Sequence, residues 1–259
     1  RPRFPAISYC EIGKYIAEIR GVKDHLVTPY DELFRLAAEA RAKGTKITAD
    51  IWPYTYSKRL TAYPTHYGGT INQLEAMVDM LAKSPITRRA IAITAVPDID
   101  LYLTEDQPCL REIQFRAIED DQGRLVLNMF TRWRSRDGYK AWPDNVIAMT
   151  HLFAKSALDL QRKSGRAVVL GTYSEENGSL HIYPQDYSDP TKSIEVCVLK
   201  FPTREAFVEK SENYDGVAPD LVVDHIRQLK TETTWKFPPV AIATMDELIR
   251  DFETGRMTP

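Results

Sequence analysis

The sequence is poor in cysteine, carries almost no net charge and contains no long apolar run. Its 259 residues include three cysteines, Cys10, Cys109 and Cys197, an odd and widely spaced set that fits neither a disulfide framework nor a zinc site. We therefore expect a reducing, cytoplasmic environment and no bound metal. No apolar run approaches the roughly 18 residues of a transmembrane helix, and no signal peptide is recognisable, so we expect no membrane partner.

The formal net charge of −2 excludes the basic footprint with which proteins bind DNA or RNA polymers. A hydrophobic content of 43% is ample for a buried core. The sequence has no internal repeat, low-complexity tract or evident linker. We therefore expect residues 1–259 to form one domain with insertions.

The spacing of apolar residues predicts both helices and strands. Helices are predicted over 9–20, 31–42, 72–81, 144–163, 204–210, 221–230 and 245–252. Strands are predicted over 90–95, 113–117, 125–130, 167–170, 180–183 and 194–200. The segment 45–69, rich in Thr, Tyr, Pro and Gly, is predicted to be irregular. Helices and strands mix without strict alternation, which predicts an α/β or α+β sheet domain.

Cys109 is the first candidate for chemistry. It follows Pro108 directly before a predicted strand. The thiolate is the reactive form of cysteine, and it needs cationic or hydrogen-bonding neighbours to lower its pKa. The alternative is an inert buried cysteine, and the Pro-Cys pair alone does not decide between the two.

Two sets of arginines precede predicted elements, namely Arg88 with Arg89 and Arg132 with Arg134 and Arg136. Guanidinium groups beside Ser135 suit a phosphate because their planar forks donate several charge-assisted hydrogen bonds. A solvated surface cluster is the alternative. Asp137 would not help a phosphate site, so it indicates a second ligand that carries donor groups.

Two further candidates are a ring pair and an acid. His181 and Tyr183 stand two residues apart in a predicted strand, so both rings would lie on one face and could bind one sugar hydroxyl. An ordinary edge strand is the alternative. Glu11 follows Cys10 on the first predicted helix, where it is either a partly buried acid or a surface one.

Together these segments resemble the thymidylate synthase family, which includes the phage deoxycytidylate hydroxymethylases. Pro108-Cys109 followed by Gln114 resembles the family's PC-x4-Q motif. Arg134-Ser135-Arg136-Asp137, with the following Ala, Pro and Asn145, resembles RS-x-D-x3-G-x-P-x-N, with Ala in place of the usual Gly.

Three weaker segments extend the resemblance. Arg88-Arg89 resembles the end of the family's P-x-SRR motif, with Thr87 in place of Ser. Residues 178–183, GSLHIY, are similar to the GSLHVY of the phage hydroxymethylase. Glu11, together with the VKD sequence at 22–24, resembles that enzyme's catalytic glutamate segment, and Tyr56 matches the spacing of the family's active-site tyrosine.

The resemblance implies a role for each residue. Cys109 would add to carbon 6 of a pyrimidine, and Glu11 (through water) and Tyr56 would assist proton transfers. The implied substrate-binding residues are Arg88, Arg89, Arg134, Ser135, Gln114, Asn145, His181 and Tyr183. Asp137 and Trp52 would bind the cofactor, 5,10-methylenetetrahydrofolate.

The resemblance also implies a fold and an assembly. The fold would be a large mixed sheet flanked by helices, with a helical insertion near 25–50 and a divergent C-terminal region at 186–259. Two subunits would pack sheet against sheet in a homodimer, so that Arg88 and Arg89 reach the phosphate of the partner subunit's pyrimidine nucleoside monophosphate.

The product and the base remain open at this point. Trp52 matches the first Trp of the synthases' IW-x-x-W segment, but Thr55 replaces the second, as in the hydroxymethylase, which favours hydroxymethyl over methyl transfer. Asn145 favours uracil, whereas the adjacent Asp144 and the GSLHIY segment favour cytosine. We expect hydroxymethylation of CMP or dCMP. The alternatives are a thymidylate synthase acting on dUMP, a uridylate hydroxymethylase and a catalytically silent nucleotide-binding homologue.

Overall fold

A four-stranded mixed sheet forms the centre of the protein. The computed structural model describes residues 12–103, 107–186 and 219–256. The sheet has the order β3 (Ile91–Ile93), β4 (Leu110–Glu119), β5 (Leu125–Trp133) and β7 (Val168–Asn177). Its first three strands are antiparallel, and β7 joins β5 in parallel. The predicted mixed α/β sheet is thus confirmed.

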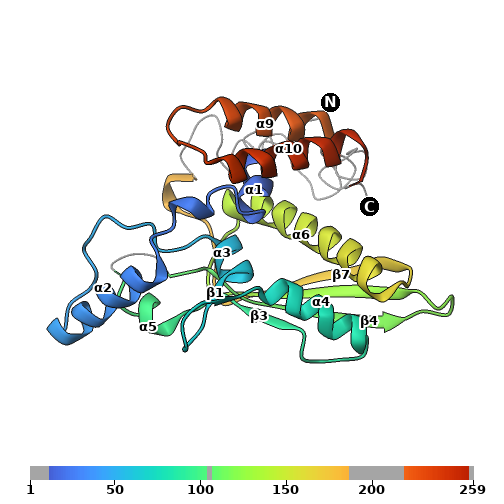
Figure 1. Ribbon diagram of the computed structural model, residues 1–259, viewed down its shortest axis with the longest axis horizontal. Coiled ribbons are helices and arrows are strands. Elements are labelled where there is room, and N and C mark those ends of the chain that lie inside the picture. The colour runs from blue at the N-terminus through green and yellow to red at the C-terminus, as the bar shows by residue number, and fades with distance from the viewer. Residues whose placement is uncertain (1–11, 104–106, 187–218, 257–259) are drawn as a thin grey trace.

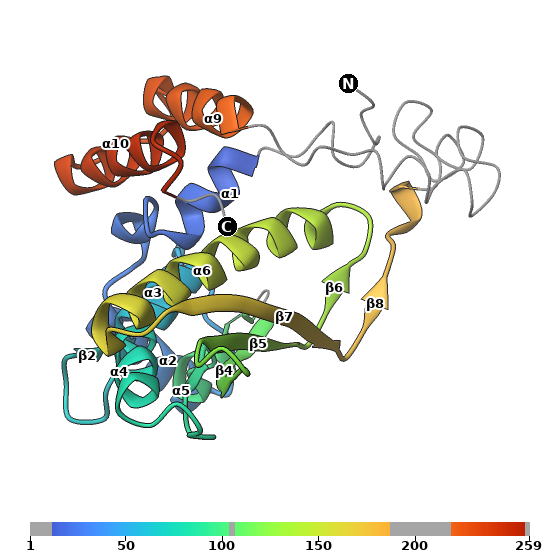
Figure 2. The ribbon, with the colours of Figure 1, turned by 90° about the vertical axis from the view of Figure 1, so that its right-hand side faces the viewer.

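Two helices cover one face of this sheet. Alternate residues of β4, such as Ile113 and Phe115, are fully buried and point toward α4 (Gln73–Lys83) and α6 (Ala141–Ser164). Figure 2 shows α6 lying across β5 and β7. Phe115 stacks on Phe153 of α6 with ring centroids 6.3 Å apart, so sheet and helix share one core.

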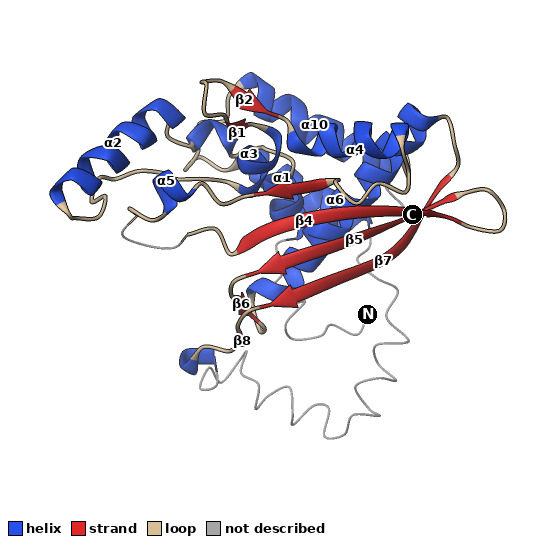
Figure 3. Cartoon of the chain, turned by 90° about the horizontal axis from the view of Figure 1, so that it is seen from below, coloured by secondary structure: helices blue, strands red, loops and turns tan. Residues whose placement is uncertain are grey.

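The opposite face of the sheet is not covered by any helix in the described ranges (Figure 3). Four large apolar side chains on its strands are between 40% and 56% exposed: Ile91, Ile93, Ile118 and Phe130. An uncovered apolar sheet face of this kind commonly marks a protein interface.

The segment before β3 contains more regular structure than the sequence predicts. The expected helix at 31–42 is α2 (Tyr30–Lys43), which ends at Gly44 with a φ of 63°. The prediction that 45–69 is irregular was wrong, because α3 (Tyr56–Thr61) and β1 (Tyr63–Pro64) lie within it. The Thr55 side chain caps α3 by accepting a hydrogen bond from the Lys58 backbone N–H.

Several short elements complete this part of the chain. They are η2 (Asp24–Leu26), β2 (Thr70–Ile71), which pairs with β1, and α5 (Pro97–Asp100), which packs against α2. Arg59 of α3 is fully buried and forms an ion pair of 2.7 Å with Asp100. This pair ties α3 to the segment that leads into β4.

The C-terminal part forms a separate helical layer on α1 (Ile12–Ile19). The helices α9 (Pro219–Thr231) and α10 (Pro239–Glu253) lie side by side above α1, as Figure 1 shows. A second core cluster joins them, with Ile16 and Ala17 of α1 packed among apolar residues of both helices. None of the helices in the described ranges is long and apolar enough to cross a membrane.

A small two-stranded sheet extends from the end of the main sheet. It pairs β6 (Arg136–Asp137) with β8 (Leu180–His181) in parallel, and η3 (Pro184–Asp186) follows. The predicted strand 180–183 is therefore shorter than expected, whereas β7 runs well beyond the predicted 167–170. The predicted strand 194–200 and helix 204–210 lie outside the described residues.

Candidate active site

Cys109 lies directly before β4, next to the arginine-serine motif. The backbone N–H of Arg134 donates to the carbonyl oxygen of Cys109 at 2.8 Å. The Arg134 guanidinium donates to the carbonyl of Gln107 at 2.8 Å. The predicted nucleophile, Cys109, and the arginine-serine motif predicted to bind phosphate are therefore neighbours in the fold, although they are distant in sequence.

Tyr56 stands beside Cys109. Burial, and after it the negative charge that Cys109 carries as a thiolate, raise the pKa of Tyr56 to about 12, although hydrogen bonding with the backbone of Leu110 and Cys109 acts to lower it. The Tyr56 ring packs edge-on against Trp133, with centroids 5.8 Å apart. Tyr56 therefore stays protonated at neutral pH and can act as a hydrogen-bond donor at the thiol.

A cavity of about 240 Å³ connects Tyr56 with two other predicted site residues, Trp52 and Asn145. Its lining comes from α1, the turn that follows it, the segment before α3 with the first residue of that helix, and the first turns of α6. The lining residues are Tyr15, Glu18, Ile19, Lys23, Trp52, Tyr54, Thr55, Tyr56, Asn145, Ala148 and Met149. The wall is mostly aromatic and aliphatic with a few polar groups, as is typical of small-molecule pockets.

The polar groups of this cavity have defined partners. Lys23 forms an ion pair of 2.6 Å with Glu18. The Thr55 hydroxyl donates to the carboxylate of Asp24. Asn145 donates from its amide nitrogen to the carbonyl of Ala141, one turn earlier in α6. Its side-chain carbonyl oxygen is the group with which Asn145 could accept from a base.

The motifs predicted to bind sugar and phosphate are joined through β6 and β8. Gly178 donates to Trp133, Arg136 to Ser179 and Gly138 to His181, each through the backbone at 2.8 Å. The rings of His181 and Tyr183 meet edge-on with centroids 4.9 Å apart, although Tyr183 lies beyond β8. The predicted ring pair therefore exists, and it adjoins the arginine-serine motif.

Asp137 is placed in β6, opposite His181. Its Oδ1 accepts hydrogen bonds from the backbone N–H groups of Tyr139 and Lys140 at 3.0 and 3.2 Å. The cavity that contains Trp52 does not include Asp137 in its lining. The two residues predicted to bind the cofactor thus lie in different parts of the site.

Arg136 is a residue whose importance the sequence did not reveal. It is 2% exposed, stacks on Trp133 with its guanidinium carbon 3.4 Å from the ring centroid, and pairs with Glu175 at 2.7 Å. Its Nε and Nη1 atoms are buried without a hydrogen-bond partner among the described residues. Only the knowledge that Arg136 meets Glu175 of β7 in the folded chain would have identified this buried cation.

Glu175 of β7 gathers the polar groups around Arg136. It accepts hydrogen bonds from the side chains of Tyr173 at 2.7 Å, Trp142 at 2.5 Å and Asn177 at 3.1 Å. Burial acts to raise the pKa of Glu175, but the hydrogen bonds from Tyr173, Arg136 and Asn177 outweigh it and lower the pKa. Glu175 is therefore an ionised anchor in β7, the strand that leads to β8 and His181.

Three predicted substrate residues lie on the uncovered side of the sheet. Arg88 and Arg89 are exposed just before β3, and the Gln114 amide donates to the Arg88 carbonyl at 3.1 Å. Gln114 and Arg132 line a shallow pocket of about 390 Å³ on this face. Within one chain these residues do not join Cys109. Ser135 is half-buried between Arg134 and Arg136, and Glu11 lies outside the described residues.

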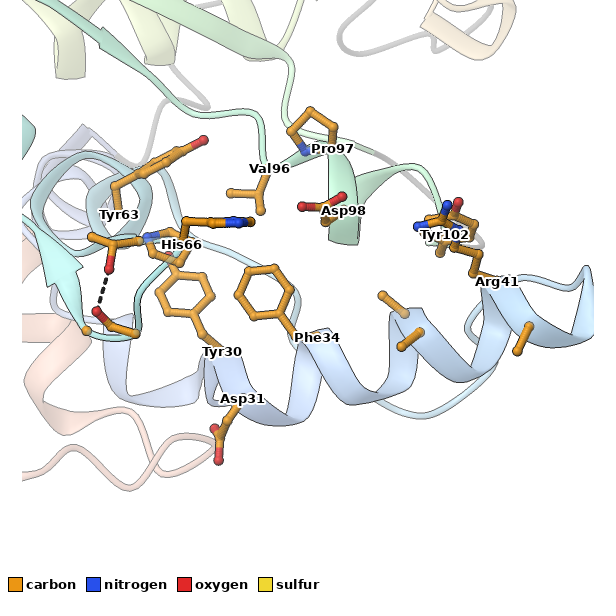
Figure 4. Close-up of a pocket in the computed structure, with 17 residues that line it drawn as sticks. Tyr30, Asp31, Phe34, Arg41, Tyr63, His66, Val96, Pro97, Asp98 and Tyr102 are labelled. Atoms are coloured by element: carbon orange, nitrogen blue, oxygen red, sulfur yellow. Dashed lines mark hydrogen bonds between the residues drawn. The ribbon is translucent and has the colours of Figure 1, made fainter.

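A pocket of about 1050 Å³ lies elsewhere (Figure 4). It is lined by Tyr30 and Phe34 of α2, by Tyr63 and His66 of the β1–β2 hairpin and by Asp98 of α5. None of the predicted site residues contributes to it. No cluster of His, Cys, Asp or Glu that could hold a metal occurs in the ranges that the structure describes.

Comparison with known proteins assigns the chain to a family. The sequence signature of thymidylate synthase matches residues 39–255. A protein named "Putative thymidylate synthase" from Methanocaldococcus jannaschii is 32% identical over 194 residues, which span 73% of this chain and 82% of the relative. Proteins of the same name from Methanococcoides burtonii and Methanopyrus kandleri are 32% and 35% identical over 62% and 52% of this chain.

The matched segments span 66% of the Methanococcoides burtonii protein and 57% of the Methanopyrus kandleri protein. The signature nevertheless covers most of the chain, including both the sheet and the C-terminal helices. The chain therefore belongs to the thymidylate synthase family, a family of folate-dependent transferases that add a one-carbon unit to a pyrimidine nucleotide. The narrower resemblance to hydroxymethylases stays a prediction.

Proposed function

We propose that this protein transfers a one-carbon unit from 5,10-methylenetetrahydrofolate to carbon 5 of a pyrimidine nucleoside monophosphate, and that it hydroxymethylates CMP or dCMP. The observation that carries the proposal is the position of Cys109 between Tyr56 and the backbone of Arg134. A thiol, a tyrosine proposed as proton donor and an arginine proposed to bind phosphate thus lie near one another, an arrangement that suits nucleophilic catalysis on a nucleotide.

In this proposal Cys109 supplies the nucleophile. Its sulfur forms a bond to carbon 6, and the electron pair of the 5,6 double bond moves to carbon 5. Carbon 5 can then bond the one-carbon unit and lose its proton, while the amine of tetrahydrofolate departs as the leaving group. Water supplies the hydroxyl group of the product, and the sulfur–carbon bond breaks as the electron pair returns to form the 5,6 double bond. Tyr56 donates a hydrogen bond at the thiol, and Glu11 keeps its proposed role in moving protons through water.

The residues that would hold the two ligands are distributed over the site. Arg134 and Ser135 would bind the phosphate, His181 and Tyr183 the sugar, and Asn145 the base. Bound 5,10-methylenetetrahydrofolate would supply the one-carbon unit, and Trp52 fits this cofactor because its indole lies in the wall of a cavity of about 240 Å³. Asp137 keeps its proposed role toward the pterin.

The uncovered sheet face supports the proposed homodimer. Its four half-exposed apolar side chains would be covered by the same face of a second copy. Arg88, Arg89 and Gln114 lie at this face, so they could act at the site of the partner rather than at the Cys109 of their own chain.

Thymidylate synthesis from dUMP is the second candidate. It is favoured by Asn145 in the cavity wall and by the names of the relatives. A cytosine substrate is favoured by Asp144, which precedes Asn145 and is 8% exposed, because it places a carboxylic acid next to the residue proposed to bind the base. A uridylate hydroxymethylase would combine the uracil base with hydroxymethyl transfer. A catalytically silent nucleotide-binding homologue would not need Cys109.

One experiment separates these candidates. The protein is incubated with CMP, dCMP, UMP or dUMP and 5,10-methylenetetrahydrofolate, and the nucleotides are analysed by mass spectrometry, with Cys109→Ser as the control. We expect a gain of a hydroxymethyl group on CMP or dCMP. A methyl gain on dUMP would establish the second candidate instead, and no gain on any nucleotide would favour the silent homologue.

A further inference from the structure

Trp235, in the loop between α9 and α10, contacts the wall of the cavity from behind. Its ring meets that of Trp52 edge-on, with centroids 5.3 Å apart and planes at 84°. The Lys23 ammonium lies 5.4 Å from the centroid of the Trp235 ring. Trp52 and Lys23 both line the cavity that also contains Tyr56, whereas Trp235 does not. A C-terminal residue therefore touches two wall residues of the site.

The backbone of Trp52 is fixed independently of Trp235. Thr28 donates from its N–H to the Trp52 carbonyl at 3.0 Å, and the Trp52 N–H donates to the Thr28 hydroxyl at 3.3 Å. These bonds hold the main chain but leave the side-chain rotamer of Trp52 to its packing. Edge-to-face contacts between aromatic rings are directional, so Trp235 selects one orientation of the Trp52 indole.

The position of Trp235 is in turn set by the packing of α9 and α10 on α1. In the same loop, Phe237 packs edge-on against His25 with centroids 5.8 Å apart. The helices approach closely at Gly13, where an added Cβ would lie 2.6 Å from the Val222 carbonyl oxygen. Such close packing leaves the loop little room to shift.

Lys23 completes the support. Its side chain is 15% exposed and forms an ion pair with Glu18 on α1 at 2.6 Å. The same ammonium faces the Trp235 ring, a favourable cation–π arrangement. The Lys23–Glu18 ion pair and the contact between the Trp52 and Trp235 rings thus stabilise each other along one side of the cavity.

We propose that Trp235 is a positioning residue, which holds the Trp52 indole as a preset wall for the flat ring system of the folate and thereby links the C-terminal helices to cofactor binding. The inference rests on the proposed function. A preset aromatic wall favours a flat ligand because its rotamer is already fixed before binding. None of the short motifs described above includes a residue of the α9–α10 loop.

The kinetic test compares Trp235→Ala with Trp235→Phe and with Phe237→Ala, a matched loss of an aromatic ring from the same loop. We expect Trp235→Ala to raise the KM for 5,10-methylenetetrahydrofolate about tenfold and to leave the nucleotide KM within about twofold. Trp235→Phe should recover most of the affinity. Phe237→Ala should lower thermal stability but leave the folate KM nearly unchanged.

A second measurement does not depend on turnover. The contact between the Trp52 and Trp235 rings should give a near-ultraviolet circular dichroism signal. Trp235→Phe and Trp52→Phe should remove this signal to the same extent, with no further change in the double variant. Equilibrium dialysis of tetrahydrofolate with the nucleotide present should show weaker binding to Trp235→Ala. If that variant does not fold, Trp235→Leu takes its place in the same assays.

The outcomes separate the inference from the function on which it rests. Turnover by the natural chain with an unshifted folate KM in Trp235→Ala would overturn the role of Trp235 alone. An equal shift in Phe237→Ala would also overturn it, because the effect would then belong to docking of the helices. Absence of turnover with all four nucleotides would instead overturn the proposed function.

Discussion

The two sides of the site are built in different ways. On the sheet side, Cys109, Arg134 and His181 are held by backbone hydrogen bonds of 2.8 Å between adjoining strands. On the helical side, the wall formed by Trp52 depends on ring contacts with Trp235 and on apolar packing of α9 and α10. The groups proposed to react are thus fixed by main-chain geometry, whereas the cavity wall is fixed by side-chain packing that many sequences could supply.

Removal of Cys109 is the change with the largest expected effect, and it tests whether the sheet side carries the chemistry. We expect Cys109→Ser to lower kcat on the order of 10⁴-fold or more, because the oxygen nucleophile is far less reactive than a thiolate. Steady-state turnover with the accepted nucleotide measures this. Melting temperature should stay within a few degrees, and a variant that keeps substantial turnover would disprove covalent catalysis by Cys109.

The buried cation of the sheet side should matter for stability. Arg136→Met leaves Glu175 without its ion pair, and we expect a loss of about 3 kcal/mol in the free energy of unfolding. Arg132→Met is the matched control, since Arg132 and Glu176 are 60% and 69% exposed, and it should cost less than about 1 kcal/mol. Urea unfolding measures both, and equal losses would show that burial does not distinguish the two pairs.

Tyr56 links the two sides, since it adjoins Cys109 and lines the cavity with Trp52. Tyr56→Phe keeps the ring and removes only the hydroxyl, so we expect kcat to fall about 10²-fold with little change in KM. Because the pKa of Tyr56 is about 12, rate changes between pH 6 and 9 should not reflect its deprotonation. An unchanged kcat would remove Tyr56 from the proton transfers.

The helical side should respond to acid through His151 of α6. This ring is 8% exposed and stacks on Phe252 of α10 at 5.5 Å. Burial, and then the charges of Arg20 and Lys155, lower the pKa of His151 to about 3. The unfolded chain therefore binds a proton below pH 6.5 that the folded chain does not, and stability falls as the pH drops from about 6.5 toward 3.

The effect of His151 can be isolated by substitution. Between pH 7 and 5 this single group should cost roughly 2 kcal/mol of stability. His151→Phe keeps the ring contact with Phe252 and should remove that part of the pH dependence. Urea unfolding of both proteins at pH 7 and pH 5 is the measurement. Parallel losses in the two proteins would mean that acid acts on other groups.

Much of the fold is predictable because local patterns determine it. Gly44 and Gly165 end α2 and α6 with left-handed φ angles of 63° and 67°. The sequence predicts these ends because each glycine directly follows a helical pattern of apolar residues. The short α3 was missed because its stability depends on burial of Arg59 against Asp100, 41 residues away. A pattern of apolar residues cannot show a contact of that kind.

The candidate site divides in the same way. Cys109, Arg134 and Asn145 are predictable because their motifs follow one another in a fixed order. Arg136 and Trp235 are not, because each depends on a partner that only the folded chain brings near. Gln114 belongs to a recognised motif, yet it lies on the uncovered sheet face, so a motif alone does not show which side of a strand its residues occupy.

The covalent bond at Cys109 is the central claim, and peptide mapping tests it most directly. The protein is mixed with 5,10-methylenetetrahydrofolate and the nucleotide that it converts, quenched in acid during turnover and analysed by mass spectrometry. We predict that the peptide with Cys109 gains the mass of the nucleotide, and that Cys109→Ser shows no such gain. The same adduct in that variant, or an adduct on another residue, would contradict this account.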